Sequence, residues 1–364
     1  MAHVELLRPE LDATGLDALE AEWRALEARA EGTFFQGWTW VGCCARERFP
    51  RPVLLRATAD GRTVGLALFN ERRRLGLSTL WLGESGDPAL DRIFVEHNGL
   101  LAESGRAGDQ AAWLRAAMRA SLPGRRAGLA WPRRRLVLGG IGAGTLAAAH
   151  AAGTVRVRAA RSAPFVDLAR LGPDGNGFLE HLSRNTRQQI RRSDRLYGPF
   201  QVQRAAMPDE AAAFLDSLLV LHVQRLASRG RESSFAHPVA KRFLRELVAR
   251  GMPRGEVDLL RISAGNAAIG YLLNLRRGGW VGQYQGGFDY AGAGPHQKPG
   301  LSSHHAAIRY YRAQGATDYD FLAGADRYKL SLADAETGLH WAETAPRLSL
   351  QSVFIKIRGI SKTR

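Results

Sequence analysis

The chain has 364 residues; 45% are hydrophobic, and 51 Lys or Arg face 35 Asp or Glu, for a formal net charge of +16 at pH 7. This length exceeds what one hydrophobic core usually holds, so we expect two domains of ordinary size. The apolar content excludes a disordered chain, and the absence of any run of about 18 apolar residues excludes a membrane-spanning helix.

The start of the chain and its cysteines indicate a cytoplasmic location. Residues Met1 to Glu5 lack the basic and apolar regions of a signal peptide. The two cysteines, Cys43 and Cys44, are adjacent, so by themselves they form neither a disulfide framework nor a metal site. We expect both thiols in or near the core, and no metal.

The first expected element is an amphipathic helix. Thr14 is expected to cap it. After this cap, Leu16, Leu19, Trp23 and Leu26 recur at helical spacing. This helix opens a first domain that we expect to cover residues 1–157.

A strand hairpin follows, and it occurs twice in the chain. Residues Leu54 to Leu68 align without gaps on Leu259 to Leu273, each copy with two apolar strands around a turn. A repeat this long predicts two copies of one supersecondary unit. The first copy continues into Gly83 to Pro88 instead of a glycine-rich loop, so we expect a scaffold or a substrate wall. Candidates for its acceptor side are Asp87, Asp91, Glu96, His97 and Asn98.

A basic helix opens the second domain, which we expect to cover residues 158–345 after a boundary between Gly153 and Ser162. Basic side chains are frequent throughout, since the chain is rich in Arg as well as Ala and Gly, and solvated Arg is the default interpretation. The clustered ones share one helix face and predict a generic anion-binding surface without interleaved aromatic rings. They are Arg184, Arg187, Arg191 and Arg195.

Two longer helices, Asp209 to Ser228 and Val239 to Arg250, are expected to bury one face each. After the second hairpin, Trp280 to Gln285 is a third strand, and the loop from Gly292 to Gly300 leads to a helix from Leu301. Unpaired N–H groups and the positive end of a helix dipole at such a loop suit a pyrophosphate.

These segments together resemble a known family. Gln297-x-x-Gly300-x-Ser302 is similar to the Gln/Arg-x-x-Gly-x-Gly/Ala loop by which GNAT-superfamily N-acyltransferases hold the pyrophosphate of acetyl-CoA, although Ser302 replaces the final small residue and Pro299 removes one N–H. From about Pro164 to Leu332 the chain is similar to the CelD/BcsL branch, itself similar to Fem-type peptidoglycan aminoacyltransferases. Four passages carry this likeness: Ser183 to Arg192, Leu221-His222-x-x-Arg225-x-x-x-Arg229-Gly230, Gln283 to Asp289, and Asp320-Phe321-x-x-Gly324-x-x-x-Tyr328-Lys329.

The resemblance implies an α+β fold with two tandem GNAT-like domains, each a mixed twisted sheet flanked by helices. It also implies transfer of an acyl group, such as acetyl, from acyl-CoA to an amine by direct attack. Acyl-CoA would then be the co-substrate at Gln283, Gln285, Gln297, Lys298, Gly300, Leu301 and Ser302, with the acceptor near Arg187, Arg191, Arg225 and Tyr328.

Direct transfer needs a proton acceptor, a polarised carbonyl and a proton for the leaving thiolate. Tyr284 is our candidate for the acid, and a structural tyrosine is the alternative. His222 is a candidate base or a packed histidine. Asp320 either binds the ammonium or caps the following loop, and Lys329 either binds the acceptor or is solvated.

The donor and the acceptor remain open at this point. The acceptor is expected to be an amine of a cell-envelope, exopolysaccharide or small-molecule precursor. A Fem-like transferase would take its acyl group from aminoacyl-tRNA, which would give the arginine stripe a reason. A degenerate GNAT module that serves as a binding or scaffold subunit of polysaccharide assembly is the non-enzymatic alternative.

The last segment, residues 346–364, is expected to form a basic amphipathic helix. One face either packs on the catalytic domain or lies on an anionic membrane surface at the inner membrane face. Its apolar residues are Leu350, Val353, Phe354, Ile357 and Ile360, beside Arg347, Lys356, Arg358, Lys362 and Arg364.

Overall fold

The computed structural model describes residues 2–74, 77–120, 134–347, 349, 351–353 and 355. The chain divides into two compact units: residues 1–160 with 338–364, and residues 161–337. Strands β7 (Thr154–Asp167) and β13 (Ala335–Ala345) each run from one unit into the other. The chain returns to the first unit because β13 pairs with β6 (Arg135–Ile141) from His340 to Thr344, whereas the sequence led us to expect consecutive domains.

The N-terminal unit is a mixed sheet flanked by helices. Its strand order is β1-β2-β3-β4-β6-β13, and β4 and β6 are a parallel pair. Buried apolar side chains such as Val53, Phe69, Trp113 and Leu136 form its core. The further elements are β1 (His3–Leu7), α1 (Ala13–Glu27), α2 (Trp38–Glu47), β2 (Pro52–Ala59), β3 (Arg62–Arg74), β4 (Leu77–Leu82), β5 (Leu101–Ala102), α3 (Gln110–Arg119) and α4 (Ala143–Ala152).

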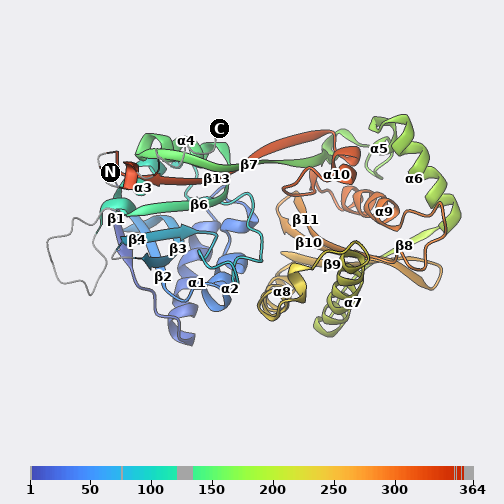
Figure 1. Ribbon diagram of the computed structural model, residues 1–364, viewed down its shortest axis with the longest axis horizontal. Helices are drawn as coiled ribbons and strands as arrows, with labels where there is room; N and C mark the ends of the chain where they lie inside the picture. Colours follow the sequence, from blue (N-terminus) through green and yellow to red (C-terminus); the bar gives the residue numbers. More distant parts are fainter. Residues whose placement is uncertain are drawn as a thin grey trace. The chain divides into compact units, whose positions relative to one another are not determined.

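The C-terminal unit has the strand order β7-β12-β11-β10-β9-β8, with β11 and β12 parallel. Figure 1 shows α7 and α8 on one face of β9 and β10, and α9 with α6 on the other. Its elements are α5 (Phe178–His181), α6 (Arg184–Tyr197), β8 (Phe200–Arg204), α7 (Pro208–Ala227), α8 (Pro238–Gly251), β9 (Val257–Ala264), β10 (Ala267–Arg277), β11 (Trp280–Phe288), α9 (Pro299–Ala313), β12 (Asp318–Asp320) and α10 (Arg327–Leu332).

The repeated hairpin of the sequence is repeated in the structure. In β2–β3 the register shift leaves Val64 of β3 without a partner in the pairing. In β9–β10 it leaves Ile269 of β10, which is the residue that aligns with Val64. The strands of the first copy meet at a tight turn where Asp60 and Gly61 both have positive φ. The α+β fold with two similar sheet units is therefore confirmed.

Local sequence explains where most helices begin. Leu16, Leu19, Trp23 and Leu26 are buried on α1 as their spacing predicts, but the cap is Asp12 and not Thr14, because the Asp12 carboxylate accepts the amide of Gly15. Prolines occupy the first turns of α7, α8 and α9, where the missing N–H costs no helical hydrogen bond. Helix α9 consequently begins at Pro299, two residues before the expected start.

Little of the expected C-terminal helix lies within the described residues. Gln351, Ser352 and Ile355 are buried, and Val353 is exposed. The other apolar residues of its predicted face, and the basic residues after Arg347, lie outside the described residues. In the part of the chain that the structure describes, no helix is both long and apolar enough to cross a membrane.

Candidate active site

The parallel strands β11 and β12 diverge inside the C-terminal unit. They pair over three residues, and this pairing ends at Gly282 and Asp320. Strand β11 continues along β10 as far as Phe288. Within the described residues, the edge of β11 from Gln283 onward therefore has no strand partner on that side. Backbone groups at such an edge are available to a ligand. The predicted Gln283, Tyr284 and Gln285 all lie on this edge.

A β-bulge interrupts β11 at the same place. Leu273 pairs with Gln285 and Asn274 with Gln283, which leaves Tyr284 as the extra residue. A bulge kinks its strand and re-aims the side chains beside it. Tyr284 is buried, and so is Gln283, whereas Gln285 is partly exposed. The bulge thus changes the direction of β11 where the strand separates from β12.

Helix α7 brings His222 to this edge. The helix approaches β11 closely, since a Cβ on Gly287 would lie 2.3 Å from the backbone oxygen of Leu218. His222 Nδ1 is 3.2 Å from the carbonyl oxygen of Gly286. A carbonyl only accepts, so Nδ1 carries the hydrogen and Nε2 keeps its lone pair. Burial lowers the pKa of His222, and the hydrogen bond to Gly286, which raises it, is the smaller effect. The imidazole is therefore a neutral acceptor at neutral pH.

The first turn of α9 follows the loop predicted to hold a pyrophosphate. The amides of Gly300 and Leu301 bond to no group among the described residues, whereas the Ser302 amide bonds to the oxygen of Lys298. In the loop, the Gly294 amide already donates to the side chain of Gln297 over 2.7 Å. Two of the predicted donor-binding groups thus remain available as backbone N–H groups.

Helix α6 supplies side chains to the same turn, and the sequence did not single these out. The Lys298 amide donates to Ser193 Oγ over 2.8 Å. The Asp194 carboxylate is 2.6 Å from Ser302 Oγ and 2.8 Å from His305 Nδ1. An anionic side chain at a helix N-terminus offsets the positive end of the helix dipole. A phosphate at Gly300 and Leu301 would have to share this end of the helix with Asp194.

One cationic group, Arg225, lies near this turn. The guanidinium carbon of Arg225 is 3.8 Å from the ring centre of Tyr290, which is a cation–π contact. A Cβ on Gly300 would lie 2.7 Å from the hydroxyl of Tyr290, so this ring reaches the start of α9. The predicted Arg225 is thereby brought close to the predicted Gly300, and Tyr290, which no motif had marked, connects them.

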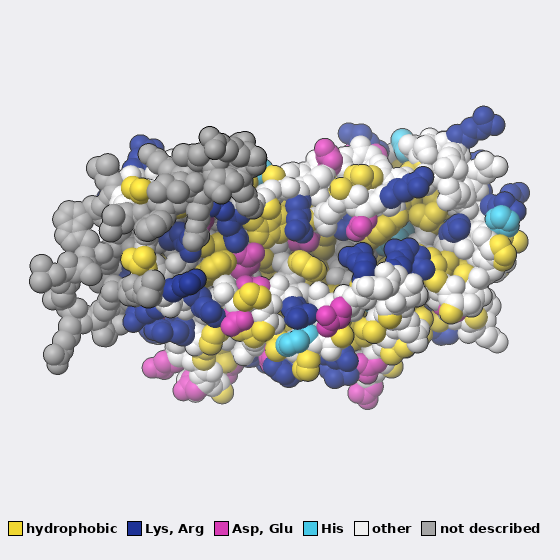
Figure 2. All heavy atoms as spheres, viewed as in Figure 1, with side chains coloured by type: hydrophobic (Ala, Val, Ile, Leu, Met, Phe, Trp, Pro, Cys, Tyr) yellow, Lys and Arg dark blue, Asp and Glu magenta, His cyan; other side chains and the backbone are white. Residues whose placement is uncertain are grey.

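The predicted arginine stripe lies along α6. A surface hollow of about 580 Å³ is lined by Arg184, Arg187, Gln188, Arg191, Asp194 and Arg195. Figure 2 shows several Lys and Arg side chains over the part of the C-terminal unit where Figure 1 places α6. Because Asp194 belongs both to this hollow and to the start of α9, the two anion-binding candidates adjoin each other.

The charged residues of the terminal motif make internal contacts. Asp320 is buried; its carboxylate accepts the Trp280 indole N–H over 3.2 Å and the Leu322 amide over 2.6 Å, and Leu322 has a φ of +62°. Lys329 Nζ donates to the oxygens of Leu322 and Ala323, at 3.3 and 2.9 Å. Both side chains therefore stabilise the turn around Leu322. For Asp320 this contact matches the alternative given above, that it caps the loop after β12.

Aromatic rings surround the same turn. Tyr328 stacks on His304 with ring centres 5.5 Å apart, and Phe288 and Phe321 contact the edges of the same imidazole. Tyr328 remains partly exposed, so one predicted acceptor-binding side chain does reach the surface beside the end of β12. Among the described residues no group of three or more His, Cys, Asp or Glu is arranged to hold a metal ion.

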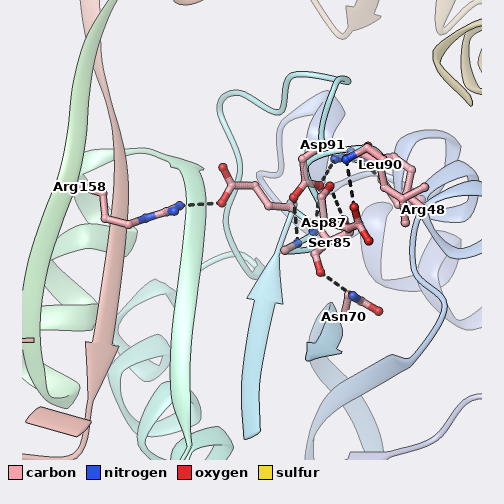
Figure 3. A network of polar contacts seen from close by, with 11 residues as sticks. Arg48, Asn70, Ser85, Asp87, Leu90, Asp91 and Arg158 are labelled. Atoms are coloured by element: carbon pink, nitrogen blue, oxygen red, sulfur yellow. Dashed lines mark hydrogen bonds and ion pairs between the residues drawn. The ribbon is translucent and has the colours of Figure 1, made fainter. Parts of the chain in front are cut away.

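The corresponding loop of the N-terminal unit is occupied by its own side chains. Figure 3 shows Asp91 between Arg48 and the loop backbone, where its carboxylate accepts the amides of Ser85 and Gly86 at 2.6 and 2.8 Å. Arg48 is fully buried, and its Nη2 is 3.0 Å from Asp91. Asn98 likewise donates to the oxygen of Gly139. Asp91 and Asn98, two acceptor-side candidates, therefore hold the loop together.

Comparison with known proteins finds a family of domains to which part of the C-terminal unit is similar. Residues 181–330 match the family described as acetyltransferase (GNAT) domain. This range includes β11, α9 and the terminal motif, so the diverging strands lie in the part of the chain that is similar to an acetyltransferase (GNAT) domain, and the protein is an acyltransferase. None of the curated proteins matches the sequence.

Solved structures share the fold along the chain. FemX is similar with a TM-score of 0.62 at 12% identity, over 93% of this chain and 98% of that one. L-PGS from Bacillus licheniformis has a TM-score of 0.52 at 10% identity, over 98% of both chains. A conserved protein of unknown function from Bacteroides thetaiotaomicron has a TM-score of 0.52 at 10% identity, over 89% and 97%. Identities this low show the fold alone.

Proposed function

We propose that this acyltransferase moves an acyl group from acyl-CoA to an amine by direct attack. The observation that carries the proposal is the divergence of β11 from β12 after Gly282 and Asp320; β11 ends at Phe288, and the loop of residues 289–298 leads from it to the first turn of α9. Beyond Gly282 no described strand covers this side of β11, and we propose that its backbone donors bind an acyl carbonyl. The amides of Gly300 and Leu301 offer donors to the phosphates of the same molecule.

The proposed chemistry uses groups already near this edge. The amine nitrogen attacks the thioester carbon, a C–N bond forms, and the C–S bond breaks. The proton that the amine loses passes to Nε2 of His222, which is neutral because burial lowers the pKa of this histidine. The leaving thiolate takes up a proton, for which Tyr284 on the bulge is the candidate donor.

The proposed acceptor is an amine on an anionic cell-envelope, exopolysaccharide or small-molecule precursor. Support comes from the charge around the site, since Arg225 lies near the first turn of α9 and Arg187 and Arg191 line the adjoining hollow. Guanidinium groups pair well with phosphates and carboxylates. The amine itself would approach β11 from the α7 side, where His222 lies.

One observation favours a second donor, an aminoacyl-tRNA. Asp194 takes up hydrogen bonds at the start of α9, where a pyrophosphate would bind, and the arginine-lined hollow beside it suits a longer polyanion. In this alternative the ester of the tRNA would occupy the edge of β11, and α6 would contact the RNA backbone. The residues proposed for proton transfer would be unchanged.

Calorimetry and single-turnover transfer separate these donors. We expect acetyl-CoA to bind the parent protein at least about tenfold more tightly than acetyl-pantetheine, because only the former carries phosphates. Gly300→Leu should weaken the binding of acetyl-CoA but not of acetyl-pantetheine, since a side chain there meets the hydroxyl of Tyr290. Arg245→Gln, on an exposed side chain paired with Asp216, is the control.

A different result would redirect the proposal. Equal affinity for acetyl-CoA and acetyl-pantetheine would remove the phosphate contacts at α9. Transfer from charged tRNA but not from acetyl-CoA, with binding that weakens steeply as salt rises, would establish the second donor. Replacing Arg187 and Arg191 together by Gln should then abolish tRNA binding and leave Arg245→Gln unaffected.

A further inference from the structure

The buried side of α9 carries a histidine that no motif singled out. His304 is 1% exposed, and its Nδ1 is 3.1 Å from the hydroxyl oxygen of Tyr319. Its Nε2 is buried and has no hydrogen-bond partner among the described residues. An unsatisfied polar atom in a protein interior costs free energy, so each case calls for an explanation.

The imidazole is neutral at physiological pH. Burial, with the nearby charge of Lys329, lowers the pKa of His304 to about 3. Lys329 does not satisfy Nε2, because its ammonium donates to the oxygens of Leu322 and Ala323. A neutral imidazole has one N–H and one lone pair, and the hydrogen bond to Tyr319 decides which nitrogen has which.

The tautomer follows from counting donors. Burial raises the pKa of Tyr319 well above its usual value, so its hydroxyl keeps the hydrogen. If that hydroxyl donates to Nδ1, only the Nε2–H of His304 is left unpaired. If Nδ1–H donated instead, both the tyrosine hydrogen and the Nε2 lone pair would be unpaired. The first arrangement leaves fewer unsatisfied groups and makes Nε2 a hydrogen-bond donor.

The ring lies where β11 and β12 have separated. Its centre is 5.5 Å from that of Phe288 at the end of β11, 6.1 Å from Tyr319 on β12, and 5.3 Å from Phe321 just after β12. The last paired residues of the two strands are Gly282 and Asp320. His304 therefore bridges the two strands, on the α9 side, beyond the point where their pairing ends.

We propose that Nε2–H of His304 donates a hydrogen bond to the carbonyl oxygen of the acyl group being transferred. This rests on the proposed function, and it adds a side-chain donor to the backbone edge of β11. When the amine attacks, that oxygen gains negative charge, and a donor held in place by Tyr319 and Tyr328 stabilises it without reorganising. His222 accepts on one face of β11 and His304 donates on the other.

The imidazole signals provide the first test, on the unmodified protein. In ¹⁵N spectra we expect His304 as the neutral tautomer with the hydrogen on Nε2, without titration between about pH 5 and 8. Acetyl-CoA should move the Nε2–H proton downfield, and CoA with a free thiol, which lacks the acyl carbonyl, should not. A hydrogen on Nδ1, or the same shift with both ligands, would overturn the inference.

Single-turnover acyl transfer with three variants is the second test. His304→Phe should lower the rate by about 10²- to 10³-fold and change the acetyl-CoA Kd only a few-fold, with no fall in melting temperature. Tyr319→Phe should lower the rate less, because the ring stays but the tautomer is no longer held. Tyr311→Phe is the matched control, since this other fully buried tyrosine donates to Asp258 and makes no hydrogen bond to His304.

The outcomes separate this inference from the proposed function. A parent protein that binds acetyl-CoA and transfers the acetyl group, with His304→Phe at an unchanged rate, would overturn the inference and leave the function standing. Equal losses in Tyr319→Phe and Tyr311→Phe would assign the effect to packing and overturn it too. A parent that neither binds acetyl-CoA nor transfers its acetyl group would refute the acyl-CoA donor, and with it the inference that rests on that donor.

Discussion

The two units contain the same parallel strand pair and use it differently. In the N-terminal unit β4 and β6 pair up to Leu82 and Leu138, and the loop after β4 is tied down by Asp91 and Arg48. In the C-terminal unit β11 continues beyond its pairing with β12, and the loop after it leads to α9, where the amides of Gly300 and Leu301 bond to no group in the part of the chain that the structure describes. The loop after β4 is held by polar side chains of its own unit, whereas the region after the β11–β12 pairing has polar groups that a ligand could bind.

This difference teaches how a duplicated unit separates stability from chemistry. Buried charges that satisfy each other, such as Arg48 with Asp91, hold a loop in place and leave nothing to bind. An unsatisfied group such as Nε2 of His304 costs stability, and under the proposal above a ligand completes this one. We infer that the N-terminal unit is a scaffold.

His222→Asn should separate chemistry from stability in the C-terminal unit. Asparagine keeps an N–H near the position of Nδ1 for the Gly286 oxygen but has no basic nitrogen, so we expect turnover to fall by about 10²- to 10⁴-fold. Because burial lowers the pKa of His222, the acid limb of kcat/KM in the parent should have its midpoint below the ordinary 6.5. A pH–rate profile and a melting curve check this.

The control is His181→Asn, on an exposed histidine of α5, which should behave like the parent. A His222→Asn protein with full turnover, or with an unchanged acid limb, would remove this residue from the proton transfer and leave the unpaired edge of β11 without an assigned base.

Arg48→Met should have the opposite signature in the N-terminal unit. Removing one partner of a buried ion pair leaves Asp91 without its countercharge, which costs about 3–5 kcal/mol of unfolding free energy. Turnover per folded molecule should not change if this unit is a scaffold. Urea unfolding followed by active-site titration measures both quantities. Lost turnover in a protein of parental stability would make this loop part of the site and break the comparison.

Asp320→Asn sharpens the comparison, because this residue belongs to the catalytic unit but makes scaffold-like contacts. An amide cannot accept from both the Trp280 indole and the Leu322 backbone as a carboxylate does, so we expect a loss of about 1–3 kcal/mol of stability. Thermal melting and single-turnover transfer should be measured together. Parental melting with turnover reduced a hundredfold would instead support a direct role of Asp320 toward the ammonium.

Glu71→Gln should have an effect that depends on pH. Burial would raise the pKa of Glu71, but hydrogen bonds from Arg73, Ser78 and Arg8 outweigh it and lower the pKa to about 2. A lowered folded-state pKa adds stability that is fully present above the ordinary 4.5 and is lost as the pH falls toward 2. Melting temperatures between pH 5 and 2 should therefore fall less steeply in Glu71→Gln than in the parent. Parallel curves would show that Glu71 does not carry this dependence.

The sequence by itself determined the local elements and the order of the motifs. The spacing of Leu16, Leu19, Trp23 and Leu26 on α1 predicted which face is buried, because helical periodicity depends only on nearby residues. The repeated hairpin predicted two similar units, and the structure adds that their register shifts lie at matching positions. The segment from Gln283 to Ser302 indicated the family, because a strand, a loop and a helix start are contiguous in the chain.

Only the tertiary structure decided which side chains are free for chemistry. Asp320 and Lys329 belong to a predicted site motif, and both also form hydrogen bonds within one turn, because Trp280 and the carbonyls of Leu322 and Ala323 come together only after folding. Conversely, Asp194 belongs to none of the predicted site motifs, and His304, next to His305, is not predicted as a site residue because adjacent residues on a helix do not face one centre. Their roles depend on partners more than ten residues away, Ser302 and Tyr319, and a sequence pattern cannot count hydrogen bonds that are made across a fold.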